Sequence, residues 1–459
     1  MALTEYVGLR QINGPFVLVE GVTGAGFGEL VDVVPPGGGV RRGRVVALEE
    51  ERALVQVFSG TGDLVPESTR TRFLGKPLEV ALAPSILGRT FSGLGEPRDG
   101  CGPVYGGVPR DVNGQALNPM ARLYPRDFIH TGLSAIDTLM TLIRGQKLPI
   151  FSGNGLPHNQ LAVQIATQSR LVGAENFAVV FAGVGIKHDD AAFFTEELID
   201  KGRTNNIVMY LNLADDPVIE RIATPRFALT AAEYLAFDLH MHVLVIITDM
   251  TNYCEALREL GVARGEVPSR KGYPAYLYSD LASIYERAGV LRDQSGSVTQ
   301  LPILSMPNDD ITHPIPDLTG FITEGQIVLS RELDAQGIYP PIDVLTSLSR
   351  LMKDGIGKGY TRDDHPNLAS QLFASYSRVQ EVRSLAGVVG EDELGKGDKA
   401  SLAFGEGFEK RFLRQGRDED REITASLDLG WELLTTLPRT ELTRVTLAQI
   451  RAHLGGAPR

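Results

Sequence analysis

A short glycine-containing loop is the first stretch of this chain whose residue types could do chemistry. The apolar run Leu148–Phe151 leads into residues 152–157, which read Ser-Gly-Asn-Gly-Leu-Pro, and apolar residues then recur at helical spacing at Leu161, Ile165 and Ala166. Strand, glycine loop and helix in this order form the frame of a phosphate-binding loop, because backbone N–H groups at a helix N-terminus attract an anion.

The loop lacks the side chains that this chemistry needs. In the motif G-x-x-x-x-G-K-[ST], the lysine reaches the outer phosphates and the hydroxyl holds magnesium. With Gly153 as the first glycine, and Gly155 inside the loop, His158 takes the place of the second glycine, Asn159 that of the lysine and Gln160 that of the hydroxyl. We therefore expect severely weakened binding and turnover of a nucleoside triphosphate. An ordinary strand-to-helix turn and a vestigial nucleotide site both fit these residues.

A carboxylate at the end of another apolar strand is the second candidate. Asp249 follows Val243–Thr248 and could order magnesium through water, or it could cap the next helix, which is the commoner role of such an Asp. His240 and His242 have same-face spacing on a strand, but no third ligand lies nearby in the sequence. We expect no metal site here, and no Cys–His or Ser–His pair indicates a nucleophile.

Three segments of different character must position these residues. Residues 1–75 contain short runs with roughly alternating Val and Leu, which predict a small β-barrel: Phe16–Val19, Glu29–Val34, Arg44–Leu48 and Ala53–Phe58. Residues 76–345 alternate strand-like and helical stretches, which predicts a mostly parallel sheet covered by helices. Two of its apolar runs, Phe177–Gly183 and His242–Thr248, read as strands buried on both faces. Residues 346–459 read as a helical domain, with Leu402, Phe404, Phe408 and Phe412 on one helix face.

Composition limits the classes of partner. The chain has 459 residues, with 45 Lys and Arg against 57 Asp and Glu, and its net charge of -12 argues against general binding to nucleic acid or anionic lipid. Two cysteines are too few for a disulfide scaffold and suit a reducing compartment. The N-terminus shows no secretory signal, and no apolar run reaches the ~18 residues of a membrane span. We expect a cytoplasmic protein that only another chain could hold at a membrane.

Several longer strings carry a family resemblance. The chain resembles the B subunit of V-type (archaeal, vacuolar and bacterial) rotary ATPases and ATP synthases along essentially its whole length, most clearly in Ile129–Asp137, Arg144–Phe151, Gly155–Asn159, Asp309–Gly320 and Pro341–Arg350. The resemblance implies an N-terminal β-barrel, a central nucleotide-binding domain like that of other rotary ATPases, and a C-terminal helical domain. The same order follows independently from the residue patterns.

The resemblance also implies a function. In that family, B chains alternate with catalytic A chains in an A3B3 ring, which works with a central rotor stalk, peripheral stator stalks and a membrane sector. The ring couples ATP hydrolysis or synthesis to proton or sodium transport on the cytoplasmic face of the membrane. The B chain is non-catalytic and has no cofactor of its own, and ATP or ADP with Mg lies at its interface with the A chain.

Two residues bear on that assignment. Ile186 stands where a catalytic chain of the family would carry the glutamate that polarises water. Arg350 ends a Ser-x-Ser-Arg segment, and in the family this arginine reaches the γ-phosphate held by the neighbouring A chain. Taken without the family, Arg350 is a solvated arginine before a glycine-rich loop.

The acidic turn Gly390–Leu394 could meet a basic rotor surface or be an ordinary solvated loop.

Two rival functions remain open. A self-sufficient hexameric ATPase, such as an export motor or helicase, should keep the Lys and the Ser or Thr that Asn159 and Gln160 replace. A purely structural spacer would leave Arg350 dispensable.

Overall fold

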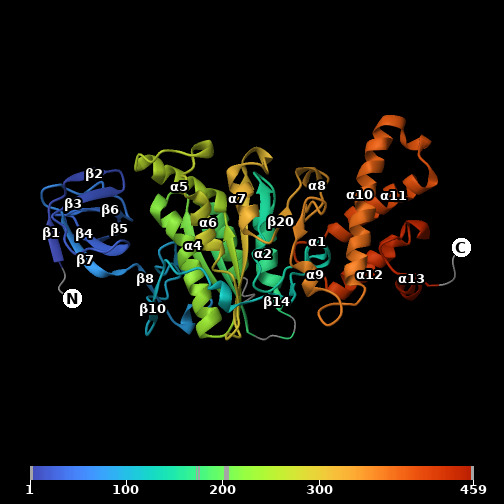
Figure 1. Ribbon diagram of the computed structural model, residues 1–459, viewed down its shortest axis with the longest axis horizontal. Helices are drawn as coiled ribbons and strands as arrows, with labels where there is room; N and C mark the ends of the chain where they lie inside the picture. Colours follow the sequence, from blue (N-terminus) through green and yellow to red (C-terminus); the bar gives the residue numbers. More distant parts are fainter. Residues whose placement is uncertain (1–3, 172, 174–175, 201–205, 456–459) are drawn as a thin grey trace.

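The three predicted parts follow one another along the molecule. The structure is a computed structural model that describes residues 4–171, 173, 176–200 and 206–455. A strand-rich part lies at one end, an α/β part in the middle and a helical part at the other end (Figure 1). This arrangement confirms the fold class predicted from the sequence.

The N-terminal part is a seven-stranded antiparallel sheet in the order β1-β7-β4-β5-β6-β3-β2. Its inward side chains, among them Val17, Val31 and Val55, form a separate apolar core. The predicted runs correspond to β3–β6. The sequence patterns missed β1 and β2, which are mostly exposed, and β7, which carries few apolar residues. The strands are β1 (Thr4–Val7), β2 (Gln11–Asn13), β3 (Phe16–Glu20), β4 (Glu29–Val34), β5 (Arg41–Glu49), β6 (Arg52–Val57) and β7 (Arg70–Pro77).

The central part is built on a second sheet, whose main path runs β21-β20-β13-β19-β17-β15-β16-β9. Neighbours on this path are parallel, except that β21 is antiparallel to β20. These strands are β9 (Thr90–Ser92), β13 (Ile150–Gly153), β15 (Phe177–Ile186), β16 (Ile207–Leu213), β17 (His242–Thr248), β19 (Ser297–Met306), β20 (Gly325–Val328) and β21 (Leu348–Ser349).

Short antiparallel pairs complete this part of the molecule. They join β8 (Glu79–Leu82) to β10 (Val108–Asp111), β12 (Ile129–His130) to β14 (Arg170–Leu171), and β11 (Arg122–Leu123) to β18 (Gly289–Leu291), which also pairs with β19.

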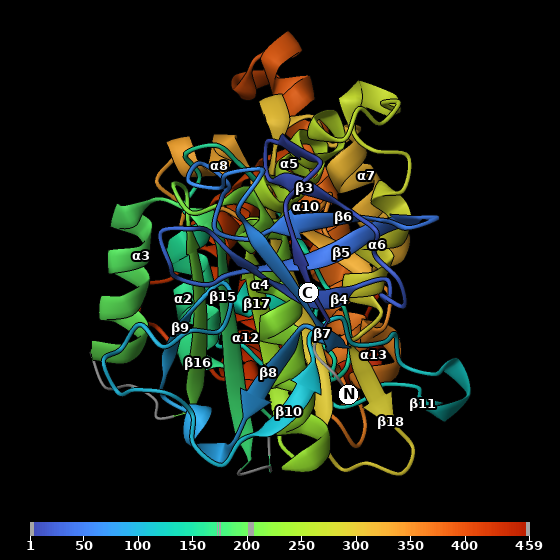
Figure 2. The same ribbon diagram turned by 90° about the vertical axis from the view of Figure 1, so that its left-hand side faces the viewer.

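Alternate residues of the central strands enter two different cores, one on each face of the sheet. Val179 and Leu244 point to the face covered by α1 (Ser134–Leu139), α2 (His158–Gln168) and α3 (His188–Thr195). Val180 and Val245 point to the face covered by α4 (Val218–Glu233), α5 (Met250–Ala263) and α6 (Leu277–Tyr285). Figure 2 shows α2 and α3 on one side of the strands and α5 and α6 on the other. The predicted burial of β15 and β17 on both faces is thereby confirmed.

The C-terminal part packs onto the first of these cores. Its helices are α9 (Met352–Gly355), α10 (His365–Val389), α11 (Lys396–Gly407), the π-helical turn η8 (Phe408–Leu413), α12 (Ile423–Leu434) and α13 (Leu447–Leu454). The rings of Phe404, Phe408 and Phe412 stack with centroids 5.7 and 5.0 Å apart. These three confirm the predicted apolar face, and the two-residue strand β21 lies just inside the segment predicted to be helical. None of the helices in the described residues combines the length and apolar character of a membrane span.

Candidate functional site

The predicted strand, loop and helix are present. Strand β13 ends at Gly153 and α2 begins at His158, so the loop lies where the parallel strands end, between β19 and β20. Gly155 has a φ of +83°, a conformation that L side chains rarely adopt. Both predicted glycines therefore belong to a true strand-to-helix loop.

An ion pair of the chain itself covers this loop. Arg331, the first residue of α8 (Arg331–Ala335), donates to Asp309 over 2.9 and 3.0 Å and to the carbonyl of Asn154 over 3.0 Å. A Cβ at Gly153 would lie 2.1 Å from Asp309 Oδ1, which shows how tightly the pair sits on the loop. Hydrogen bonding to Arg331 lowers the pKa of Asp309, so a carboxylate charge stands beside the loop. Both residues were missed as site residues by the sequence analysis.

The side chains at the motif positions are engaged with neighbours. His158 Nδ1 lies 2.9 Å from the hydroxyl of Ser152, and burial lowers the pKa of His158 against the opposing charges of Asp249 and Asp190. Asn159 donates to Asp190 over 2.8 Å, and Gln160 is partly exposed. The loop thus holds no cationic side chain where the motif has its lysine.

Asp249 caps α5. Its Oδ1 accepts hydrogen bonds from the backbone N–H groups of Thr251, at 2.7 Å, and Ser305, at 3.1 Å, which confirms the capping interpretation. Ile186 is buried at the end of β15, and its apolar side chain cannot act as a base. Among the described residues, no group of three or more His, Cys, Asp or Glu side chains could hold a metal ion.

A cavity of about 610 Å³ opens beside the loop, between Pro157 and the C-terminal part. Lys410, Arg414 and Arg417 line it, and the guanidinium of Arg417 lies 5.9 Å from the ring centroid of Tyr339. Basic and aromatic groups of this kind can hold an anion next to a flat ring. No sequence pattern joined these residues to the loop, because they come from a different part of the chain.

Arg350 lies elsewhere on the sheet. It follows the edge strand β21 and is exposed, and its backbone N–H donates to the carbonyl of Glu324 over 2.9 Å. Its Nη1 donates to the carbonyl of Thr323 over 3.1 Å. The first contact holds the backbone of Arg350, and the second ties one guanidinium nitrogen to the carbonyl of Thr323 and so fixes the direction in which the side chain leaves the sheet.

A polar scaffold supports Arg350 from behind. The buried Gln146 donates to the hydroxyl of Ser349 over 2.9 Å and to the carbonyl of Glu324 over 3.2 Å. Ser349 in turn donates to the carbonyl of Thr141 over 3.0 Å. Lys147, only 3% exposed, forms ion pairs with Glu286 at 2.8 Å and Glu324 at 2.9 Å. Buried polar groups that are hydrogen-bonded in this way rigidify their surroundings.

The loop and Arg350 occupy opposite edges of the sheet, at the two ends of its strands. The loop lies at the carboxyl ends of the parallel strands, and Arg350 lies at their amino ends. Ser349 pairs with Gly325, two residues before Ile327, which pairs with Ile150; Gly153 lies three residues after Ile150. At ~3.3 Å per residue, the two sites are separated by about 16 Å along the strands. Because Arg350 continues away from the loop, its guanidinium cannot serve the chain's own loop.

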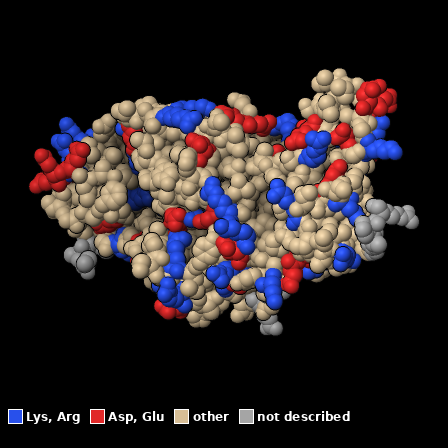
Figure 3. Space-filling model, turned by 45° about the vertical axis from the view of Figure 1, so that its right-hand side comes forward, with Lys and Arg blue, Asp and Glu red and all other residues tan. Residues whose placement is uncertain are grey.

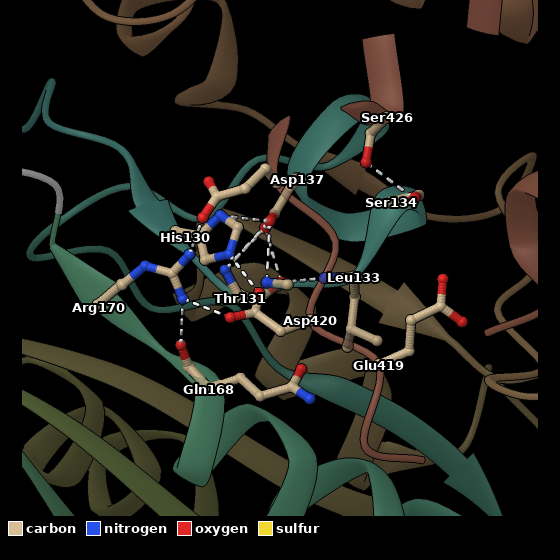
Figure 4. A network of polar contacts seen from close by, with 12 residues as sticks. His130, Thr131, Leu133, Ser134, Asp137, Gln168, Arg170, Glu419, Asp420 and Ser426 are labelled. Atoms are coloured by element: carbon tan, nitrogen blue, oxygen red, sulfur yellow. Dashed lines mark hydrogen bonds and ion pairs between the residues drawn. The ribbon is translucent and has the colours of Figure 1, made fainter. Parts of the chain in front are cut away.

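A partly buried polar network joins the central part to the C-terminal part. His130 Nε2 lies 2.7 Å from Asp420 and its Nδ1 lies 3.2 Å from Asp137, while Arg170 pairs with Asp420 at 2.6 Å (Figure 4). Burial raises the pKa of Asp137 to about 6. The backbone carbonyl of Gln168, the last residue of α2, accepts from Arg170 over 3.4 Å, so the network also contacts the helix that follows the loop.

Comparison with known proteins agrees with this architecture. Residues 9–75 match the beta-barrel domain of the ATP synthase alpha/beta family, residues 132–349 its nucleotide-binding domain, and residues 354–454 the C-terminal domain of V and A type ATP synthase.

Relatives match over the whole chain. A V-type ATP synthase beta chain of Halothermothrix orenii is 62% identical over 458 residues, covering 100% of this chain and 99% of the relative. One of Thermotoga neapolitana is 62% identical over 453 residues, covering 99% and 98%. A solved structure, the ATP synthase subunit NeqB from Nanoarcheaum equitans, superimposes with a TM-score of 0.73 at 41% identity and covers 92% of this chain and 98% of its own. The chain therefore belongs to the ATP synthase alpha/beta family, among its V-type beta chains.

Proposed function

We propose that this chain is the non-catalytic B subunit of its rotary complex and completes the ATP site of a neighbouring catalytic A chain with Arg350. The observation that carries the proposal is the placement of Arg350 at the sheet edge opposite to its own loop. An exposed guanidinium on a rigid base, with no nucleotide loop within reach, is suited to a phosphate held by another subunit. Such a group stabilises the charge that develops during phosphoryl transfer.

The loop supports the non-catalytic part of the proposal. Asn159 is bound to Asp190, His158 to Ser152, and the pair Arg331–Asp309 lies over Gly153. Any nucleotide held here would have to do without the lysine and the hydroxyl of the motif. We expect at most loose binding, with Gly153, Gly155, His158, Asn159, Gln160 and Asp249 as a vestigial site.

The assembly follows from the same proposal. The chain alternates with A chains in an A3B3 ring that holds ATP or ADP with Mg at the A–B interface. The ring contacts central rotor and peripheral stator stalks and drives proton or sodium transport through a separate membrane sector, on the cytoplasmic face of the membrane. The acidic turn Glu391–Glu393, at the far end of the long helix α10, is the segment we assign to the rotor side; acidic atoms gather at the tip of this projection in Figure 3.

The decisive experiment compares rings built from an A chain and variants of this chain. Arg350→Ala should leave assembly intact and lower ATP hydrolysis at least about a hundredfold, the lower side of the range for arginine fingers. Arg350→Lys should recover little of the rate, because an ammonium group cannot form two parallel bonds to phosphate oxygens. Arg10→Ala, which removes an exposed arginine of the barrel, is the matched control and should hydrolyse ATP at the normal rate.

Two outcomes would reject the proposal. Normal hydrolysis by the Arg350→Ala ring would favour a structural spacer. Robust Mg-ATP turnover by the isolated, purified chain would favour a self-sufficient ATPase.

A further inference from the structure

A second cavity, of about 460 Å³, lies in the seam between the barrel and the central part. Three arginines from three different elements line it: Arg44 from β5, Arg226 from α4 and Arg264 from the end of α5. Figure 3 shows Lys and Arg atoms deep in a recess between the barrel, at the left, and the rest of the molecule. The cavity is remote from both sheet edges discussed above and takes no part in the proposed function.

The carboxylate that lines this cavity is already engaged. Asp280 accepts a hydrogen bond from Arg226 over 3.0 Å through one oxygen and a bond from the hydroxyl of the buried Tyr253 through the other. Its negative charge therefore balances Arg226 and leaves little for the other two arginines.

The other two guanidinium groups are poorly matched. Arg264 reaches Glu266 only at 3.4 Å, and its Nε is buried without a hydrogen-bond partner. Arg44 makes one hydrogen bond, from Nε to Gln56 over 3.1 Å, and forms no ion pair within the described part of the chain. Both groups thus keep unused donors at the cavity.

Three positive charges around one cavity have an electrostatic cost. Burial, together with the like charges of Arg226 and Arg264, lowers the pKa of Arg44 to about 10. A guanidinium pKa falls in this way when its positive charge is unfavourable in the folded state. An anion between the arginines would remove the repulsion, and planar guanidinium forks match the oxygens of a phosphoryl group.

We propose that this cavity binds a small phosphoryl-type oxyanion, held by Arg44, Arg226 and Arg264. Its size lies in the lower part of the range for small-ligand pockets, ~300 to 1,000 Å³. Ile222, Leu257 and Leu260 line the same cavity, so a phosphate ester with a compact apolar group fits as well as the free ion. The bound anion would join the barrel to α4 and α5, because its ligands come from both.

Isothermal titration of the full-length chain tests this proposal. The probes are inorganic phosphate, pyrophosphate and phenyl phosphate at constant ionic strength, without magnesium. The test variant is Arg44→Gln. The matched control is Arg42→Gln, because Arg42 is an exposed arginine of the same strand and its replacement changes the net charge equally.

We expect one site with a Kd below about 1 mM for at least one probe, weakened at least about tenfold by Arg44→Gln and less than about twofold by Arg42→Gln. Tighter binding of phenyl phosphate would assign the apolar wall to a phosphate ester, and tighter binding of pyrophosphate would assign the site to an inorganic anion. Without ligand, Arg44→Gln should melt at the same or a higher temperature than the parent chain, because it removes a repelled charge.

The proposal is overturned if the parent chain binds none of the probes up to about 10 mM, or if Arg44→Gln binds them as the parent does. Should Arg44→Gln fail to fold, Arg264→Lys replaces it. This variant keeps the charge but loses the planar fork, and undiminished binding by a folded Arg264→Lys would equally reject the site.

Discussion

The polar side chains at the two opposite edges of the central sheet have different surroundings. At the loop edge, Asn159 and Gly153 face groups of the same chain: Asp190 binds the amide, and the pair Arg331–Asp309 covers the glycine. At the other edge, Arg350 is exposed, and its guanidinium donates to the carbonyl of Thr323 through one nitrogen. One edge is neutralised internally, whereas the other presents a charge on a rigid base.

This difference shows that losing a lysine is only part of what changes a nucleotide loop. The neighbours of the loop also supply hydrogen bonds that a phosphate would otherwise make. In contrast, the groups that support Arg350 bond to one another and to nearby backbone carbonyls, and they leave its exposed side chain uncovered.

The largest effect is expected from the ion pairs that the buried Lys147 forms behind Arg350. Lys147→Met removes the cation that Glu286 and Glu324 share, although Glu286 keeps its ion pair with Arg122, and should lower the free energy of unfolding by about 3 kcal/mol, the lower end of the range for breaking a buried pair, as measured by urea denaturation. Lys358→Met, which removes an exposed lysine, should change it by less than about 0.5 kcal/mol. Equal stability of the two variants would show that charge does not support this edge.

The next effect depends on pH. His365 is buried and bonded to the carbonyl of Thr138 in α1, the helix beside Thr141, and burial lowers its pKa to about 4. The unfolded chain, with a His pKa near ~6.5, therefore takes up this proton first. The stabilising contribution is complete above about pH 6.5 and is lost on acidification toward pH 4, by up to about 3 kcal/mol.

Chemical denaturation at several pH values measures this loss. His365→Gln should be less stable at pH 7, and its unfolding free energy should fall less steeply between pH 6.5 and 4. Parallel pH profiles for the variant and the parent would contradict the assignment to His365.

A smaller effect is expected from the hydroxyl that joins β21 to its scaffold. Ser349→Ala removes the bonds to Gln146 and Thr141 and loosens the base of Arg350. Rings carrying it should assemble normally and hydrolyse ATP about tenfold more slowly, which corresponds to roughly 1.4 kcal/mol. The exposed Ser85→Ala is the control. An unchanged rate would mean that Arg350 needs no rigid support.

The smallest effect is expected from restoring the motif. Asn159→Lys combined with Gln160→Ser should raise the affinity of the isolated chain for Mg-ATP by less than about tenfold, because Asp190 can pair with the new lysine and Arg331–Asp309 still covers the loop. Calorimetric titration measures this change. A gain of about a thousandfold would show that the two edges differ only by the missing lysine.

Much of the fold could be predicted because apolar patterns are local. The runs that became β15 and β17, and the phenylalanines of α11 and η8, could be placed from spacing alone. Strands β1 and β7 could not, because their residues are mostly polar or exposed, and β21 is too short to leave a pattern.

The site was predicted less completely, for a physical reason. Gly153 and His158 lie in one continuous segment, so a motif could find them. Asp309 and Arg331 reach the loop only through tertiary structure, from positions more than a hundred residues away. Arg350 was identified by resemblance alone, since nothing in its local sequence distinguishes it from a solvated arginine; its proposed role remains to be tested.

The antiparallel direction of β21 has one more consequence, for measurements on the assembled complex. No side-chain rotation can carry Arg350 to the loop at the far end of its own sheet. An isolated subunit therefore cannot bring this arginine to its own loop. If Arg350 acts on a neighbouring chain as proposed, ATP hydrolysis should fall to background when the complex dissociates on dilution. The rate should then follow the concentration of assembled complex rather than the amount of folded protein.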